Sequence, residues 1–252
     1  MSIPYDHDYD DEQDDEPVLN AQERKAISGD RWFSSLSPSL RHDILRLAFV
    51  RRYTDGQLIG ARGDPAEHWL ACAKGAVRMS SVTVSGKLVA LTYLEPGAWF
   101  NDVGLFDGQR NTHDTYAHGD TTVLCLARAD FDKILATHAE LYDALLRLQA
   151  RRIRALFGLV EDLNALPLRA RLARQLLHQV RAYGVPSLTD ASHVRIGLQL
   201  AQEELAQLVG ASRQRVNQEL KAMERENAIR VEAEGLVVID RAALRRISDA
   251  TE

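Results

Sequence analysis

The hydrophobic positions of the chain change their period twice. From Leu19 to about Val50 the spacing is helical, and Ser37-Pro38 places a proline at a plausible first helical turn. The period then becomes two, in short runs separated by glycine-containing turns. The predicted strands are Arg51–Arg62, Trp69–Ala73, Gly75–Val84, Lys87–Leu94 and Thr121–Ala127. Regular turns at this spacing predict an antiparallel sandwich, roll or barrel over about residues 45–130.

A long helix is predicted after this β region. From Phe131 to Asn164 the sequence contains one glycine, Gly158, and no proline, while aliphatic residues repeat at spacings of three to five. Such a helix presents more apolar surface than one small sheet can cover. The excess predicts a coiled-coil-like partner, most simply the same helix of a second subunit, with burial inside one chain as the alternative. Leu166-Pro167 should end the helix and mark a domain boundary.

Two short amphipathic helices joined by a tight turn are predicted within Gln202–Asn227. Apolar residues of the first helix recur at three- and four-residue spacing and therefore share one face. Gly210 can adopt a positive φ, and Ser212 can cap the second helix, which should begin at about Arg213. A helix Arg169–Tyr183 and a short strand near 193–196 are predicted before this pair.

The second helix of the pair has an outward face rich in long polar side chains. Val216, Leu220 and Met223 form its inward stripe. The candidate DNA-binding residues at its start and on its outer face are Ser212, Arg213, Gln214, Arg215, Asn217, Gln218 and Lys221. Arginine can bridge O6 and N7 of guanine, glutamine or asparagine can match adenine, and lysine can meet a phosphate. This face predicts a helix that reads a DNA major groove; the alternative is a helical hairpin with a solvated polar face.

A predicted hairpin follows the helix pair. Ile229–Val231 and Leu236–Ile239 flank Glu232-Ala233-Glu234-Gly235, a turn that contains glycine. A helix-turn-helix followed by such a hairpin is a winged helix. The wing would be placed to touch phosphates or the minor groove.

Charge is unevenly distributed along the 252 residues. The net charge is −5, but residues 1–16 carry eight acidic groups, and the rest of the chain is slightly basic. Such a tail is expected to be disordered, either as a solubilising extension or as a competitor with DNA for the basic face. No apolar run reaches the roughly 18 to 20 residues that span a bilayer, and no secretion signal is present, so a cytoplasmic location is expected.

The sequence gives little support for a disulfide, a metal site or an enzyme active site. Cys72 and Cys125 lie in apolar strand-like runs, which favours reduced core thiols over a disulfide or metal site. His113, Asp114 and His118 are close in sequence and could suggest a metal or haem ligand set, but a polar loop is the ordinary explanation. No catalytic pair or phosphate-cradling loop is found, so an enzyme is not expected.

The order of these parts resembles the catabolite-activator (Crp/Fnr) superfamily of bacterial transcription regulators over roughly residues 30–245. The resemblance rests on YTDGQLI, GDPAEHWLACAKGAVRM and LEPGAWFNDVGLFDGQRNTHD in the β region, and on LAQLVGASRQRVNQELKAME in the helix pair. It implies an α+β fold: an acidic tail (1–20), a cyclic-nucleotide-binding-type antiparallel β-roll (21–136), a dimerisation helix (137–165) and a winged helix-turn-helix (166–252). It also implies a homodimer, a pseudo-palindromic double-stranded DNA site and RNA polymerase as a partner.

The resemblance assigns the leading Ser-Arg pair of the recognition helix to Ser212 and Arg213, and later groove contacts to Gln214, Gln218 and Lys221. The best-known member has Glu and Arg where Gln214 and Gln218 stand. Its half-site sequence therefore cannot be transferred to this chain.

The effector region departs from the pattern of members that bind cyclic AMP. Their Phe-Gly-Glu-Leu segment is Phe100-Asn101-Asp102-Val103 here, and their phosphate-binding Arg-Ser pair aligns with Asn111-Thr112, with Arg110 one position away. Leu156 and Phe157 stand where such sensors offer hydroxyls to adenine. Asp102 could still accept from a ribose.

These differences argue against cyclic AMP as the effector. They leave open cyclic di-GMP, another nucleotide, or a vestigial loop with no ligand. A second class of function is a cyclic-nucleotide sensor, for cyclic AMP or cyclic di-GMP, whose winged helix mainly mediates protein assembly.

Overall fold

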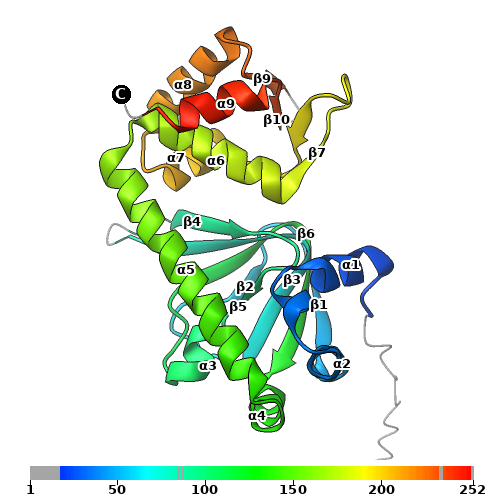
Figure 1. Ribbon diagram of the computed structural model, residues 1–252. Coiled ribbons are helices and arrows are strands. Elements are labelled where there is room, and N and C mark those ends of the chain that lie inside the picture. The colour runs from blue at the N-terminus through cyan, green and yellow to red at the C-terminus, as the bar shows by residue number, and fades with distance from the viewer. Residues whose placement is uncertain (1–17, 84–85, 87, 233–234, 251–252) are drawn as a thin grey trace, which may run out of the picture.

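The computed structural model describes residues 18–83, 86, 88–232 and 235–250. Figure 1 shows two lobes with a long helix running along the first and leading into the second. The acidic residues of the predicted tail lie outside the described residues. Leu19 is buried and Asn20 caps the first helix. No helix in the described part of the chain is long and apolar enough to cross a membrane.

The first lobe is an antiparallel β-roll preceded by two helices, as the sequence predicts. The sheet order is β1-β6-β3-β4, with β2 on β6 and β5 on β3. Its elements are α1 (Ala21–Gly29), a 3-10 turn (Phe33–Ser35), α2 (Pro38–Leu47), β1 (Phe49–Tyr53), β2 (Leu58–Gly60), β3 (His68–Val82), β4 (Leu88–Leu94), β5 (Trp99–Phe100), α3 (Val103–Asp107) and β6 (Asp114–Ala127). Together with the helical second lobe, this confirms the α+β fold class.

Aromatic side chains fill the core of the β-roll. Trp69 and Trp99 lie with ring centroids 4.2 Å apart, and Trp32 meets both rings edge-on. The Trp32 indole also donates to the carbonyl of Ala144, on the long helix, at 2.9 Å. Aromatic pairs of this kind add roughly 0.5–1.5 kcal/mol beyond the area they bury. They fix the N-terminal helices and the long helix against one face of the sheet.

Strand β3 corrects one expectation. The sequence predicts two strands separated by a turn at Lys74-Gly75, but β3 continues through this point with shifts in its register against β6. Gly75 has φ of +75°, and a Cβ there would lie 2.6 Å from the Asp120 carbonyl oxygen. The glycine therefore serves a bulge inside one long strand. Strand β6 likewise begins at Asp114, earlier than the predicted Thr121.

The predicted uninterrupted helix over 131–164 is wrong at one point. The chain forms α4 (Arg128–Thr137) and α5 (Glu140–Ala165), with a break at 138–139. His138 has φ of −120° and ψ of 83°, and its Nε2 lies 2.8 Å from Asp43 of α2. A tertiary contact at the break, with no local glycine or proline, explains why the pattern did not reveal it.

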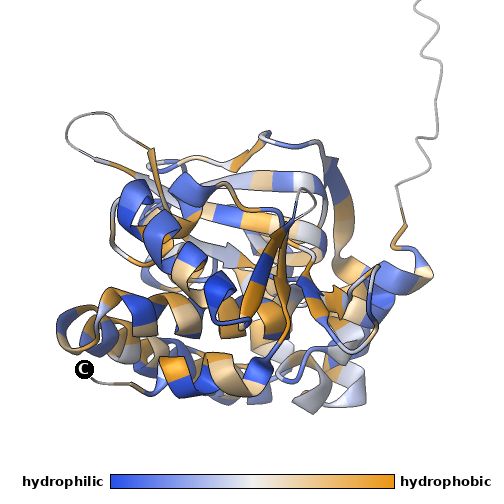
Figure 2. Ribbon diagram, turned by 90° about the horizontal axis from the view of Figure 1, so that it is seen from above, coloured by the Kyte–Doolittle hydropathy of each residue, from blue (hydrophilic) through white to orange (hydrophobic). Residues whose placement is uncertain are grey.

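The second lobe is a winged helix. Its elements are α6 (Leu168–Tyr183), β7 (Gly184–Pro186), β8 (Val194–Ile196), α7 (Gln202–Leu208), α8 (Arg213–Arg225), β9 (Ile229–Glu232), β10 (Gly235–Val238) and α9 (Arg241–Ser248). The sheet order is β7-β8-β10-β9. Hydrophobic and hydrophilic positions alternate along its helices (Figure 2), as amphipathic packing requires. Helix α9 was not predicted from the sequence, although Asp240 caps it by accepting from two backbone amides.

Cys72 and Cys125 are both buried and free. Burial raises the pKa of Cys72 to about 12 and that of Cys125 to about 11. Thiols with such pKa values hold little thiolate near neutral pH, so both behave as core residues.

Candidate nucleic-acid interface

Local sequence determines the start of helix α8. Gly210 has φ of +63°, and the Ser212 hydroxyl accepts from the backbone amide of Arg215 at 3.4 Å. Val216, Leu220 and Met223 are almost fully buried, as their spacing predicts. The helix therefore presents one fixed side to the core and the opposite side to solvent.

The predicted reading residues lie on this solvent side. The exposed residues are Ser212, Arg213, Gln214, Arg215, Gln218 and Lys221, and Asn217 is half-buried. Within the described chain, the side chains of Arg213, Gln214, Arg215, Gln218 and Lys221 form no hydrogen bond or ion pair with the protein. Figure 1 places α8 at the end of the second lobe farthest from the β-roll. This face is therefore open to a partner the size of a duplex.

Some other arginines of the second lobe have acidic partners. Arg169 lies 2.5 Å from Glu226, and Arg230 lies 2.6 Å from Glu232 on the wing. Pairing with carboxylates leaves these cations less available to phosphates. The wing turn residues Ala233 and Glu234 lie outside the described residues.

The effector region begins with a left-handed residue. Asn101 has φ of +66°, a conformation that glycine favours and asparagine tolerates better than most residues. Its side-chain amide donates to the His68 carbonyl at 3.0 Å. The Asn101 side chain is thus bonded to strand β3. Val103, two residues later, is exposed at the start of α3.

Asp102 is buried and bonded to the long helix. Arg152 of α5 donates to both carboxylate oxygens at 2.9 Å, and Gln149 donates to one of them. Arg152 also donates to the Trp99 carbonyl. A ribose hydroxyl at Asp102 would have to share the carboxylate with these two donors. Sequence reasoning missed Arg152 and Gln149, because a pair about 50 residues apart leaves no local pattern.

The loop aligned with the phosphate clamp contains no free cation at the aligned positions. Arg110 donates to the Gly63 carbonyl at 2.7 Å. The Asn111 Oδ1 is buried and has no partner among the described residues, and Thr112 is bonded to His113 at 2.8 Å. Asn111 and Thr112 are uncharged, and Arg110 is already bonded to a backbone carbonyl. None of these residues therefore offers the free guanidinium that a bidentate phosphate clamp needs.

Leu156 and Phe157 lie on an exposed apolar stripe of α5. Their exposed fractions are 60% and 70%, and Leu146, Ile153 and Val160 continue the stripe. Neither side chain can offer a hydrogen bond to adenine. Such a contiguous apolar surface on one chain is typical of a surface that a partner covers.

The histidine candidates do not form a metal site. His118 Nε2 lies 2.8 Å from the Gln199 carbonyl oxygen, Asp114 accepts from the Arg62 backbone amide, and His113 bonds Thr112. No group of three or more possible ligands comes together in the part of the chain that the structure describes.

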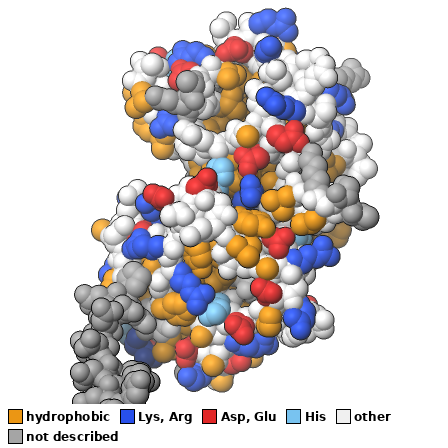
Figure 3. Space-filling model, turned by 180° about the vertical axis from the view of Figure 1, so that it is seen from behind, with side chains coloured by type: hydrophobic (Ala, Val, Ile, Leu, Met, Phe, Trp, Pro, Cys, Tyr) orange, Lys and Arg blue, Asp and Glu red, His pale blue; other side chains and the backbone are white. Residues whose placement is uncertain are grey.

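The two lobes meet through a polar contact that the sequence did not predict. Glu204 of α7 accepts from Tyr93 of β4 and from Arg78 of β3, and the Ala90 amide donates to Gln207 at 2.8 Å. Figure 3 shows acidic, basic and histidine side chains gathered where the lobes meet. Burial raises the pKa of Tyr93, and the bond to Glu204 raises it further. The first helix of the reading pair is thereby attached to the β-roll.

Two protein-family models match parts of the chain. Residues 50–138 match the cyclic nucleotide-binding domain, and residues 170–247 match the Crp-like helix-turn-helix domain. The chain is 30% identical over 219 residues to the cyclic AMP receptor protein of Thermus thermophilus, covering 86% of this chain and 96% of that protein. It is 28% identical over 214 residues to a CRP-like cAMP-activated global transcriptional regulator of Mycobacterium tuberculosis, covering 85% and 94%.

A solved structure has the same fold. FixK2 from Bradyrhizobium japonicum superimposes with a TM-score of 0.71 at 20% identity, covering 81% of this chain and 99% of that one. The Mycobacterium tuberculosis relative is a transcriptional regulator and not an enzyme, which agrees with the expectation from the sequence.

Proposed function

The chain belongs to the Crp/Fnr family of bacterial transcription regulators, and from this membership we propose that it acts as a homodimer on a pseudo-palindromic DNA site. The family's DNA-binding module is present, so regulation of transcription through DNA is its general role. RNA polymerase is the partner that this role implies. The domain divisions predicted from the sequence, at 20–21, 136–137 and 165–166, belong to the same proposal.

The exposed face of α8 is the observation that carries the DNA-binding proposal. Arg213 is proposed to read guanine, and Gln214, Asn217 and Gln218 to read adjacent bases. Arg215 and Lys221 are proposed to contact phosphates. Support comes from the exposure of all these side chains except Asn217, which is half-buried, and from the capped start at Ser212. Among the described residues, no acidic side chain pairs with Arg213, Arg215 or Lys221. A helix with only a solvated polar face would not need amide side chains at positions 214, 217 and 218.

The homodimer is supported by the apolar stripe of α5. Leu146, Ile153, Leu156, Phe157 and Val160 are each more than half exposed in one chain. Burying this stripe against its own copy would give parallel long helices and a two-fold axis. Two reading helices related by that axis would then meet successive major grooves.

The β-roll is proposed to respond to an effector other than cyclic AMP, or to none. Cyclic AMP would find no bidentate cation at Asn111-Thr112 and no hydroxyl at Leu156 or Phe157. Each unpaired polar group of a buried ligand costs roughly 1–3 kcal/mol. Cyclic di-GMP or another nucleotide therefore ranks with the absence of an effector, ahead of cyclic AMP.

Selection of bound sequences from random DNA, with and without a panel of nucleotides, tests the proposal. The expected result is a two-fold symmetric site whose affinity does not depend on cyclic AMP. Salt-labile binding without any sequence preference would instead favour a protein-assembly role for the winged helix. Calorimetry that showed micromolar cyclic AMP binding would overturn the ranking of effectors but leave the DNA-binding proposal intact.

A further inference from the structure

Helix α5 carries a seam of exposed side chains at the spacing of a coiled coil. Its apolar members are between 42% and 69% exposed in one chain: Tyr142, Leu146, Ile153, Leu156, Val160 and Leu163. With position 149 included, they alternate at spacings of four and three residues, which is the heptad repeat. One core position of the repeat holds Ile153 and Val160 and the other holds Leu156 and Leu163, a combination that favours two parallel strands. The occupant that fits this seam is therefore a second copy of α5, aligned in parallel.

Gln149 is the polar residue of this seam. It stands between Leu146 and Ile153, where the repeat calls for an apolar side chain. A polar residue inside a coiled coil weakens the pair, but it also restricts which alignment of the helices is stable. Once the seam is covered, Gln149 needs hydrogen-bond partners, because a buried amide without them is destabilising.

One half of the Gln149 amide is held by its own chain. Leu145 and Leu148 pack in the core of the β-roll, and Gln149 lies about 100° further round the helix than Leu148, between the β-roll side and the seam. Its Nε2 donates to the carboxylate of Asp102, which is 1% exposed and also accepts from Arg152. A carboxylate in such a pair accepts and does not donate, so the bond turns the amide nitrogen toward Asp102.

The other half of the amide is available to a partner. Within the described chain, Gln149 Oε1 and the second N–H of Nε2 form no hydrogen bond. Gln149 is half-buried, and its Oε1 is not among the buried side-chain atoms that lack a partner, so this oxygen reaches solvent. Two parallel copies of α5 in register would present the same amide to each other, and each amide offers one acceptor and one donor.

We propose that Gln149 joins the Asp102 carboxylate of its own chain to Gln149 of the second copy, so that Asp102 helps to set the strength of subunit association. This inference rests on the proposed homodimer and adds a positioning residue to it. A ligand group that donates to Asp102 would compete with the Gln149 amide. The effector region and the subunit seam would then be linked through one side chain.

A double-mutant cycle on the dissociation constant of the full-chain dimer tests this link. Sedimentation equilibrium measures the original chain, Asp102→Asn, Gln149→Leu and the double variant. Asp102→Asn should weaken association by roughly two- to tenfold, the range of one net hydrogen bond, because Gln149 loses its fixed orientation. In the Gln149→Leu background the same change should alter the constant by less than about twofold. The loss of the Arg152 bond is common to both backgrounds and cancels in the cycle.

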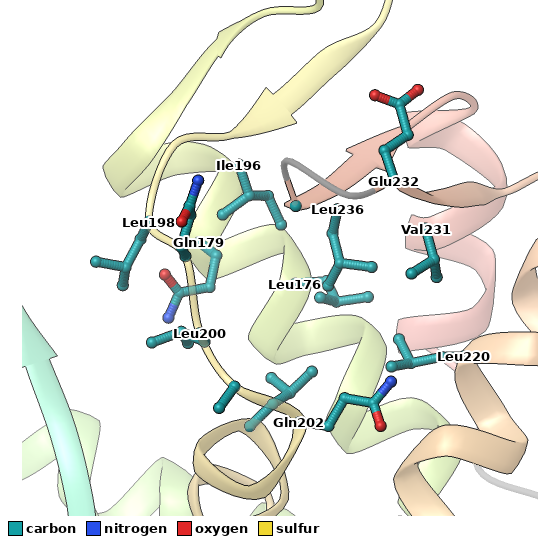
Figure 4. Close-up of a pocket in the computed structure, with 14 residues that line it drawn as sticks. Leu176, Gln179, Ile196, Leu198, Leu200, Gln202, Leu220, Val231, Glu232 and Leu236 are labelled. Atoms are coloured by element: carbon teal, nitrogen blue, oxygen red, sulfur yellow. The ribbon is translucent and has the colours of Figure 1, made fainter.

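Gln149→Glu guards against an Asp102→Asn chain that does not fold. It keeps Asp102 and places a like charge beside it and beside its own copy, which should weaken association by about tenfold or more at pH 7. Arg151→Glu, on the outer side of α5, is the matched control and should leave the constant unchanged. The second lobe packs around a cavity of its own (Figure 4), whose described lining includes no residue of α5. These substitutions should therefore leave the reading lobe folded.

Three results would overturn the proposal for a chain that is a dimer. They are an equal effect of Asp102→Asn in both backgrounds, no effect of Asp102→Asn in either, and association of Gln149→Glu as tight as that of the original chain. An original chain that stays monomeric would instead overturn the proposed homodimer, and the inference with it. The state of the original chain thus distinguishes the two failures.

Discussion

The hydroxyl of Tyr93, on strand β4, donates to Oε1 of Glu204, on helix α7, across 2.6 Å. Arg78 Nη1 approaches the same oxygen at 3.3 Å, and Tyr93 is 3% exposed. Hydrogen bonds to ionised groups are about twice as strong as neutral ones. This contact therefore sets how the reading pair sits on the β-roll, and its loss should loosen the joint before it unfolds either lobe.

Tyr93→Phe should loosen the contact between the lobes. The substitution removes one buried bond to a charged group, which contributes roughly 1.5–3 kcal/mol. Hydrogen exchange should accelerate by about tenfold or more for the Ala90 amide, which donates to Gln207 across the same interface. Tyr142→Phe is the control, because the Tyr142 side chain is exposed on α5. Equal protection of Ala90 in the original chain and Tyr93→Phe would contradict the prediction.

Arg213→Ala should reduce both affinity and sequence preference for DNA. Loss of a bidentate base contact should cost roughly 1–3 kcal/mol on the selected site and relax the preference at one base pair. Lys221→Ala, on the same face, should weaken selected and random DNA alike, because a phosphate contact carries no sequence information. Competition binding at fixed salt measures both effects. Arg147→Ala, an exposed arginine of α5, is the control. Equal losses on both DNAs for Arg213→Ala would refute its role in base reading.

Phe157→Glu should convert the proposed dimer to a monomer. A charge in the centre of the apolar stripe would have to be buried without a partner, which strongly disfavours association. Arg151→Glu places the same charge on the opposite side of α5 and should leave the dimer intact. Sedimentation equilibrium distinguishes the two states. A dimer that survives Phe157→Glu at micromolar concentration would show that another surface joins the subunits.

The sequence predicted the reading helix well because its determinants are local. Gly210, Ser212 and the spacing of Val216, Leu220 and Met223 lie within 14 residues and define the turn, the cap and the buried side. The β-roll was predicted as a class but not in detail. A bulge at Gly75 looks the same as a turn until the partner strand is known.

Contacts between distant segments could not be predicted from periodicity. The bond between Asp102 and Arg152 and the contact of His138 with Asp43 join residues 50 and 95 positions apart. A charged residue in a polar loop or on a helix gives no sign of its partner. For the effector region, the sequence therefore indicated only which cyclic-AMP-binding groups are missing. The structure adds the partners of Asp102, which are Arg152 and Gln149.

Glu23→Gln should reduce the stability of the β-roll at neutral pH. The buried Glu23 carboxylate accepts from the Asn20 amide, Arg52 and Thr122, each at 2.8 Å. Burial alone would raise the pKa of Glu23, but these bonds outweigh it and hold the pKa at about 2. A lowered folded pKa stabilises the protein fully above the ordinary value of 4.5 and progressively less as pH falls toward 2.

The original chain and Glu23→Gln should therefore differ by roughly 1–3 kcal/mol near pH 7 and converge as pH falls from about 4.5 toward 2. Urea unfolding followed by tryptophan fluorescence measures this, because Trp32, Trp69 and Trp99 all lie in the β-roll core and report on that lobe. Glu67→Gln, at an exposed position on the same lobe, should show no such convergence. A difference that stays constant between pH 7 and pH 3 would mean that Glu23 stabilises the lobe through shape and not through its charge.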